Sequence, residues 1–216
     1  LLVFLPFSAG YFLSYLYRSV NAVISTDLID EFGLSASALG LLTSAYFLGF
    51  ASLQIPVGLM LDRIGPRRTN AFLLLLAGSG AVVFSMSNGL AGLLLGRTLI
   101  GFGVAACLMS SIKAFTVWFP LERLPAMTGR MMFVGGLGAI SATAPVEAAL
   151  HVTDWRGLFL MLGLATNSKV WPVYLFRRCS GKSLSVPRCF SHSTWQFRGC
   201  GQDRGWLMWL ASVGRR

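Results

Sequence analysis

The sequence predicts an all-α membrane protein, a polytopic helical bundle, on three observations. First, 55% of the 216 residues are hydrophobic and only 12% are charged, whereas soluble proteins carry about 25% charged residues. Second, residues 32–61 and 69–96 form uncharged runs of 30 and 28 residues, and each is longer than the roughly 20 residues that cross a bilayer as a helix. Third, a short charged turn joins these runs, so the two spans are connected on one face of the membrane.

The elements follow from where charges and turn residues interrupt the apolar pattern. An acidic loop with Asp27, Asp30 and Glu31 ends the first span, and Ser87-Asn88-Gly89 is a tight turn after the third. A loop over 113–125 ends the fourth span, and Trp155 begins the last. We expect spans at about 1–25, 36–57, 69–86, 90–112, 126–150 and 155–176. The first five are clear, and the sixth is partial or irregular.

The charged turn over residues 58–68 carries the most specific pattern. It reads G-x-x-x-D-R-x-G-x-R-R, and its defining positions are Gly58, Asp62, Arg63, Gly65, Arg67 and Arg68. An ordinary cytoplasmic loop would explain the basic residues, but neither the acid nor the glycines. We expect the glycines to allow a sharp turn and close helix contact. We expect Asp62 to cap a helix start and to accept hydrogen bonds from nearby arginines.

This pattern resembles the signature loop between helices 2 and 3 of the major facilitator superfamily of secondary transporters. The resemblance implies that residues 1–166 form the N-terminal six-helix half of that fold, and that the turn latches the two halves on the cytoplasmic face. Arg97 followed by Gly101 and Gly103 resembles the helix 4 motif, which implies proton coupling or helix locking. The alternative for Arg97 is a structural bond to a neighbouring carbonyl. Trp155-Arg156 resembles the opening of helix 6.

Helix 5 departs from one branch of the family. Drug antiporters carry Gly-Pro there, whereas this chain has Ala144-Pro145, so drug:proton antiport is disfavoured. Glu147, near the end of this span, is a candidate for proton coupling, and its alternative reading is an interface carboxylate.

Arg18 is the main candidate for binding a substrate. A charge inside a span costs at least about 2.5–3.5 kcal/mol, so it must face a partner or a wet cavity. Helix 1 lines the central cavity in the family, and residues 17–24 loosely resemble its anion-handling branches, which implies that Arg18 binds an anion. A guanidinium can bind such a group with two parallel hydrogen bonds. The alternatives are pairing with Glu147 or backbone carbonyls, and snorkelling to the interface. Further site candidates, each also readable as a packing residue, are Tyr11, Tyr15, Asn21 and Tyr46.

The charges of the loops predict the orientation. The turn over 58–68 and the region 113–130 together hold six basic residues, whereas the opposite loops hold Asp27, Asp30, Glu31 and Asp154 against Arg156. Because basic loops stay in the cytoplasm, the N-terminus is predicted to be cytoplasmic. The predicted location is the bacterial inner membrane.

Residues 167–216 have a different composition, with nine of the eighteen Lys and Arg residues, one acid and no sustained apolar period. We expect a basic, irregular tail. An out-of-frame reading, a genuine cytoplasmic tail near anionic lipid and a metal site are the alternatives. The metal site is disfavoured because Cys179, Cys189 and Cys200 lack paired spacing. Residues 171–176 are apolar enough for the sixth span to continue across Lys169.

These patterns predict a transporter rather than an enzyme. No G-x-x-x-x-G-K-[ST] phosphate loop is present, so ATP-driven transport is disfavoured, and no cofactor or metal is expected. A chain this apolar belongs in lipid and not on nucleic acid. We predict secondary transport of a small anionic solute by alternating access, with a coupling proton as a further candidate partner and the chain as a fragment of the carrier. The alternatives are a non-transporting half-carrier that acts as a scaffold or sensor, and a self-assembling half-transporter.

Overall fold

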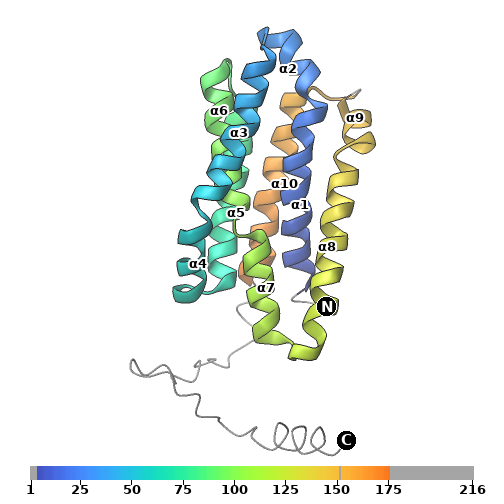
Figure 1. Ribbon diagram of the computed structural model, residues 1–216. Coiled ribbons are helices and arrows are strands. Elements are labelled where there is room, and N and C mark those ends of the chain that lie inside the picture. Colours follow the sequence, from blue (N-terminus) through green and yellow to red (C-terminus); the bar gives the residue numbers. More distant parts are fainter. Residues whose placement is uncertain (1–3, 151, 176–216) are drawn as a thin grey trace, which may run out of the picture. The chain divides into compact units, whose positions relative to one another are not determined.

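The computed structural model describes residues 4–150 and 152–175, and all regular structure within them is helical (Figure 1). The prediction of an all-α fold is therefore confirmed. In chain order the elements are α1 (Phe4–Val23), α2 (Ser25–Phe32), α3 (Ala36–Ser52), α4 (Gln54–Arg63), α5 (Pro66–Ser85), α6 (Leu90–Val104), α7 (Cys107–Trp118), η1 (Leu121–Arg123), α8 (Leu124–Ser141), α9 (Ala144–Leu150) and α10 (Trp155–Leu175).

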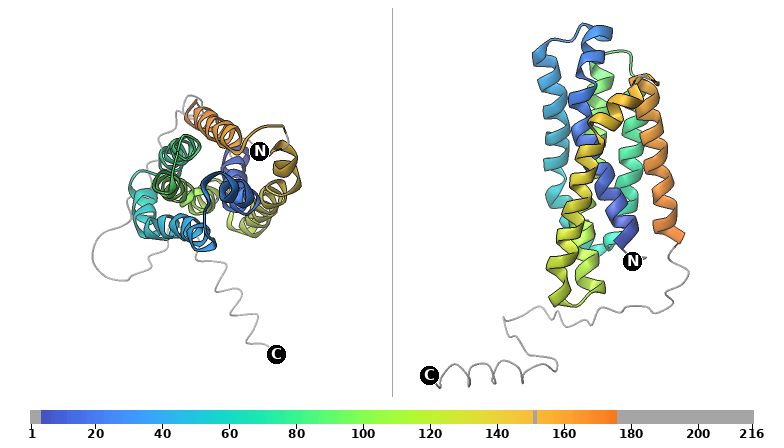
Figure 2. Two further views of the ribbon diagram at one scale, coloured as in Figure 1. Left: turned by 90° about the horizontal axis from the view of Figure 1, so that it is seen from above. Right: turned by 90° about the vertical axis from the view of Figure 1, so that its right-hand side faces the viewer.

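Four helical stretches among the described residues are long and apolar enough to cross a membrane. They are Ala36–Arg63, Pro66–Ser85, Leu90–Trp118 and Leu121–Leu150. The 20-residue α1 and the 21-residue α10 run beside them in the same bundle (Figure 2), and each is about 30 Å long at 1.5 Å per residue. The protein is thus a multi-pass membrane protein, while the count of six spans stays a prediction.

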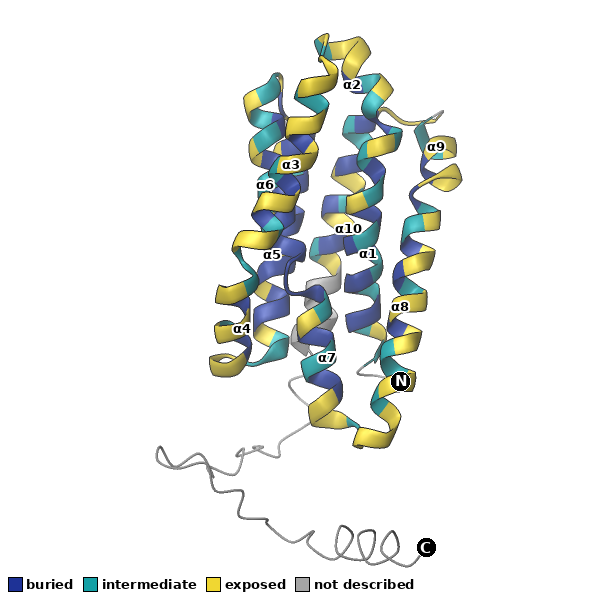
Figure 3. Cartoon of the chain, viewed as in Figure 1, coloured by how far each residue is buried: buried dark blue, intermediate teal, exposed yellow. Residues whose placement is uncertain are grey.

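The core of the bundle lies around α5. This helix packs against α6 and against α10, α6 also packs against α3, and α1 packs against α8. Large side chains fill the space between them, among them the fully buried Tyr17, Phe84, Phe115 and Phe159. Most residues of α3, α4, α8 and α9 are not buried, whereas α5 and α6 are largely covered (Figure 3).

Three spans that the sequence predicts as continuous, at 36–57, 90–112 and 126–150, are each divided into two helices, and the first and third of these breaks lie next to a proline. Pro56 has no N–H to donate to the carbonyl of Ser52, and α3 ends at Ser52. Pro145 has the same relation to Ser141, where α8 ends. Because proline removes this hydrogen bond and its ring crowds the same carbonyl, both breaks follow from the prolines.

Several predicted loops are instead helical. The acidic loop after the first span contains α2, and the predicted loop over 113–125 begins inside α7, so Lys113 lies on a helix. The span predicted to end at Val57 continues as α4 to Arg63, which leaves only Ile64 and Gly65 between two helices. The predicted span ends are set by charged residues, which mark the membrane boundary. A helix can continue past that boundary, because its backbone hydrogen bonds do not depend on the surrounding lipid.

The last helix runs without interruption from Trp155 to Leu175, across Asn167, Ser168 and Lys169. The rest of the predicted basic tail, with its three cysteines, lies outside the described residues.

Candidate functional site

Three candidates lie close together on α1. Tyr15, Arg18 and Asn21 are spaced three residues apart, so they follow one side of the helix. Arg18 is exposed, and its guanidinium carbon lies 4.9 Å from the centre of the Phe47 ring on α3. Within the described residues Arg18 forms no ion pair. The alternative pairing with Glu147 is therefore wrong, and Glu147 is exposed on α9.

Arg97 on α6 is the most deeply buried charge in the described part of the chain, with 1% of its surface exposed. One terminal nitrogen donates to the carbonyl of Tyr17 at 3.2 Å, and the other donates to the Asn21 side-chain oxygen. The guanidinium carbon also lies 4.8 Å and 5.4 Å from the ring centres of Phe84 and Phe159. All these partners are neutral, and they join α6 to α1, α5 and α10.

The Asn21 amide is occupied on both sides. Its oxygen accepts from Arg97, and its nitrogen donates to the Thr43 hydroxyl on α3 at 3.0 Å. In this structure Asn21 therefore links three helices, and these bonds compete with any bond to a substrate. The sequence pattern did not predict Thr43 as a partner of Asn21.

Among the tyrosine candidates, Tyr11 and Tyr46 are buried and Tyr15 is half-buried. The Tyr11 hydroxyl lies 3.3 Å from both the Tyr15 hydroxyl and the sulfur of Met132 on α8, and the Tyr11 and Tyr15 rings meet edge to face at 5.0 Å. Tyr46 is 5% exposed and packs its ring edge-on against Phe47 at 5.3 Å. Tyr15 thus lies beside α8, whereas Tyr46 acts mainly through packing.

The glycines of the helix 4 motif lie where α6 contacts its neighbours. A Cβ atom on Gly101 would collide with the carbonyl of Tyr46 on α3, and one on Gly103 would collide with the backbone of Ala77 on α5. Both glycines therefore allow close backbone contact, as small residues do between membrane helices.

The signature turn differs from its prediction in two respects. Asp62 forms an ion pair with Lys113 on α7, and the start of α5 has Gly65 at its cap with no side-chain hydrogen bond. The predicted helix cap by Asp62 is therefore wrong, and Lys113 is a partner that the sequence analysis missed. Arg63 and Arg68 are exposed, and Arg67 is half-buried.

The two glycines of this turn also differ from each other. Gly65 has a φ of 90°, which favours glycine. Gly58 lies inside α4, and a Cβ atom there would meet nothing within 4 Å. The expectation of a sharp turn holds at Gly65 only, and within the described residues Gly58 mediates no close helix contact.

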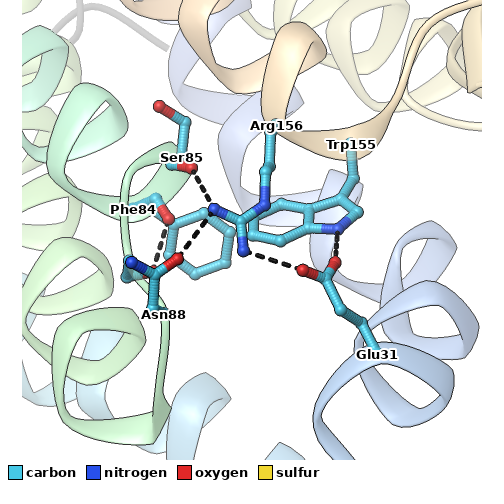
Figure 4. A network of polar contacts seen from close by, with 7 residues as sticks. Glu31, Phe84, Ser85, Asn88, Trp155 and Arg156 are labelled. Atoms are coloured by element: carbon cyan, nitrogen blue, oxygen red, sulfur yellow. Dashed lines mark hydrogen bonds and ion pairs between the residues drawn. The ribbon is translucent and has the colours of Figure 1, made fainter.

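A second polar cluster lies at the other end of the bundle (Figure 4). Glu31 accepts from the Trp155 indole at 2.6 Å and from Arg156 at 2.7 Å, and Arg156 also donates to Ser85 and Asn88 at 3.3 Å. We call these five residues the Glu31 network. Hydrogen bonding from Arg156 holds the pKa of Glu31 below its ordinary value of 4.5, against the effect of desolvation, and Trp155 adds to the lowering. The network joins α2, the α5–α6 connection and α10.

The charges that predict orientation gather at opposite ends of the bundle. The α4–α5 and α7–α8 connections, with their basic residues, lie at the end where α1 begins (Figure 1). The residues of α2 and the start of α10 lie at the opposite end, where Asp27, Asp30, Glu31 and Asp154 line one pocket of about 400 Å³. The predicted separation of charge is thus present in the fold.

Comparison with known proteins identifies relatives. Residues 7–188 match the family model of the Major Facilitator Superfamily. The chain is 30% identical over 154 residues to a probable sulfoacetate transporter of Cupriavidus necator, covering 71% of this chain and 36% of that protein. It is 29% identical over 160 residues to a probable L-galactonate transporter of Escherichia coli, covering 70% and 34%. The chain thus spans about a third of the length of these relatives, which are named as transporters and not as enzymes.

A solved structure shares the fold. It is a bacterial homolog of the human lysosomal transporter Spinster, in an inward-facing and unoccupied conformation. The TM-score is 0.74 at 20% sequence identity, and the match covers 91% of this chain and 45% of that one.

Proposed function

This chain belongs to the Major Facilitator Superfamily, and from that premise we propose that it forms the N-terminal half of a secondary transporter for a small anionic solute. Carriers of this kind rock two halves around a site near the bilayer midplane. The named substrates of the relatives, sulfoacetate and L-galactonate, are both anions at neutral pH, which supports this solute class. We further propose a bacterial inner membrane location with the N-terminus in the cytoplasm.

The observation that carries the proposal is the environment of Arg18. Its guanidinium is exposed, lies on α1 and has no ion-pair partner among the described residues. An uncompensated charge in a span is expensive, and a bound anion offsets that cost. The planar guanidinium also presents two parallel N–H groups, the arrangement that suits carboxylate and sulfonate oxygens.

The test replaces Arg18 by lysine, which keeps the charge but removes the paired N–H groups. We expect Arg18→Lys to weaken the binding of radiolabelled sulfoacetate or L-galactonate by about tenfold or more, because a point charge cannot form the bidentate contact. Binding is measured on the 216-residue chain in lipid nanodiscs, with Arg68→Lys on the exposed turn as the matched control. Equal affinity in Arg18→Lys and the wild type, or binding of neutral and cationic analogues only, would contradict the proposal.

A flux assay separates a carrier from a scaffold or sensor. Only a carrier moves the labelled anion down its gradient in proteoliposomes. Flux through proteoliposomes that contain this chain alone would also show that the chain assembles with itself into a carrier.

A further inference from the structure

Phe47 has a position that the apolar pattern of its helix does not explain. Its side chain is 39% exposed on α3, a surface that usually meets lipid. Its ring centre lies 4.9 Å from the guanidinium carbon of Arg18 on α1. The ring therefore faces the charge on which the proposed function depends.

The packing of α3 against α6 determines where this ring lies. The absence of a side chain at Gly101 lets the Tyr46 carbonyl contact α6, and a Cβ atom on Gly49 would lie 2.7 Å from the carbonyl of Thr98. The backbone on both sides of Phe47 is thus in close contact with α6. Tyr46, which is buried, supports the Phe47 ring edge-on at an interplanar angle of 85°.

A guanidinium that stacks on an aromatic ring keeps its anion-binding edge free. An aromatic ring attracts the face of a guanidinium through its quadrupole, whereas a carboxylate or sulfonate binds in the guanidinium plane through the N–H groups. The two contacts use different surfaces of the same group. A guanidinium restrained on one face also loses less side-chain entropy when the anion binds.

We propose that Phe47 is a positioning residue that orients Arg18 for in-plane binding of the substrate anion. This inference rests on the proposed function and adds a residue on a second helix to the same site. Gly49 and Gly101 contribute indirectly: they allow the close contact of α3 with α6, and this contact places Phe47 opposite Arg18.

The experiment uses three variants of the full 216-residue chain in nanodiscs. Phe47→Leu removes the quadrupole and keeps an apolar side chain, Phe47→Trp keeps the quadrupole, and Phe72→Leu changes an exposed phenylalanine on α5 as a matched control. From the strength of cation–π contacts we expect Phe47→Leu to weaken binding of sulfoacetate or L-galactonate by about 3- to 30-fold. Phe47→Trp and Phe72→Leu should bind within about twofold of the wild type.

A second measurement reports the contact without any ligand. The Arg18 side-chain protons should show an upfield ring-current shift in NMR spectra of arginine-labelled protein, retained in Phe47→Trp and Phe72→Leu and lost in Phe47→Leu. Absence of the shift in the wild type would overturn the inference. The inference is also overturned if Phe47→Leu binds the anion with wild-type affinity while Arg18→Lys no longer binds it. That result would leave the proposed function intact. If the wild type binds no anion, the proposed function fails and the positioning role fails with it, while the shift still reports the ring contact.

Discussion

Arg97 and Asn21 show how a bundle in lipid accommodates a buried charge without an acid. The described contacts of Arg97 are a backbone carbonyl, an amide oxygen and two aromatic faces. Each is neutral, yet each presents partial negative charge to the guanidinium. Because the four contacts come from three other helices, the arginine joins the core, where 1% of its surface is exposed and its Nε–H has no hydrogen-bond partner among the described residues. This separates it from Arg18, which is exposed.

Glu31 provides a prediction about pH at the scale of one residue. Its pKa is lowered in the folded state, chiefly by Arg156, so its stabilising effect is present above its ordinary pKa and is lost as pH falls through the lowered value. We expect wild type and Glu31→Gln to differ in free energy of unfolding by about 1 kcal/mol or less near pH 7, because the ion pair is partly exposed. That difference should shrink as pH falls below the ordinary pKa of 4.5 and vanish only below the lowered pKa of Glu31.

Unfolding in mixed detergent micelles across this pH range measures the difference. Comparing the two variants cancels every contribution that the two proteins share, including that of the other acids that line the same pocket. A difference that persists or grows on acidification would show that Glu31 does not stabilise the fold as a carboxylate.

At the scale of elements, the two glycines Gly101 and Gly58 form a matched pair. Gly101→Ala should destabilise the bundle by about 1–3 kcal/mol, because the new methyl group meets the Tyr46 backbone and α3 must move from α6. Gly58→Ala meets open space inside α4 and should be neutral or stabilising by up to about 1 kcal/mol, since alanine favours helix. Thermal unfolding of both variants in detergent tests the order, and equal effects would contradict the packing described here.

The sequence predicts these elements better than it predicts their contacts. The uncharged runs locate the spans because bilayer thickness sets their length, and the positive φ of Gly65 agrees with the turn that its motif implies. The breaks at Ser52 and Ser141 follow from Pro56 and Pro145, but a bundle can also compensate a proline, so the pattern alone did not predict them. The partners Lys113, Thr43 and Phe47 come from other helices, and one sequence without packing contains no signal for them.

At the scale of the whole molecule, the separation of charge predicts orientation. The basic connections lie at one end and the acidic ones at the other, and basic connections stay in the cytoplasm. In a variant whose four native cysteines are serine, we expect Asp30→Cys to react with an impermeant maleimide in intact bacterial cells. Arg68→Cys should react only after the membrane is permeabilised. Labelling of Arg68→Cys from outside would reverse the topology.

The proline breaks have a consequence for motion. The two least buried spans each contain a joint, and the short segments beyond these joints, α4 and α9, lie at opposite ends of the bundle (Figure 1). Each joint lacks one backbone hydrogen bond, so bending there disrupts fewer bonds than bending elsewhere in the helix. A bend at Leu53 moves only the end with the signature turn, and a bend at Ala142 moves only the acidic end. In the proposed half-carrier, one end of the bundle can therefore change shape while the other end keeps its own.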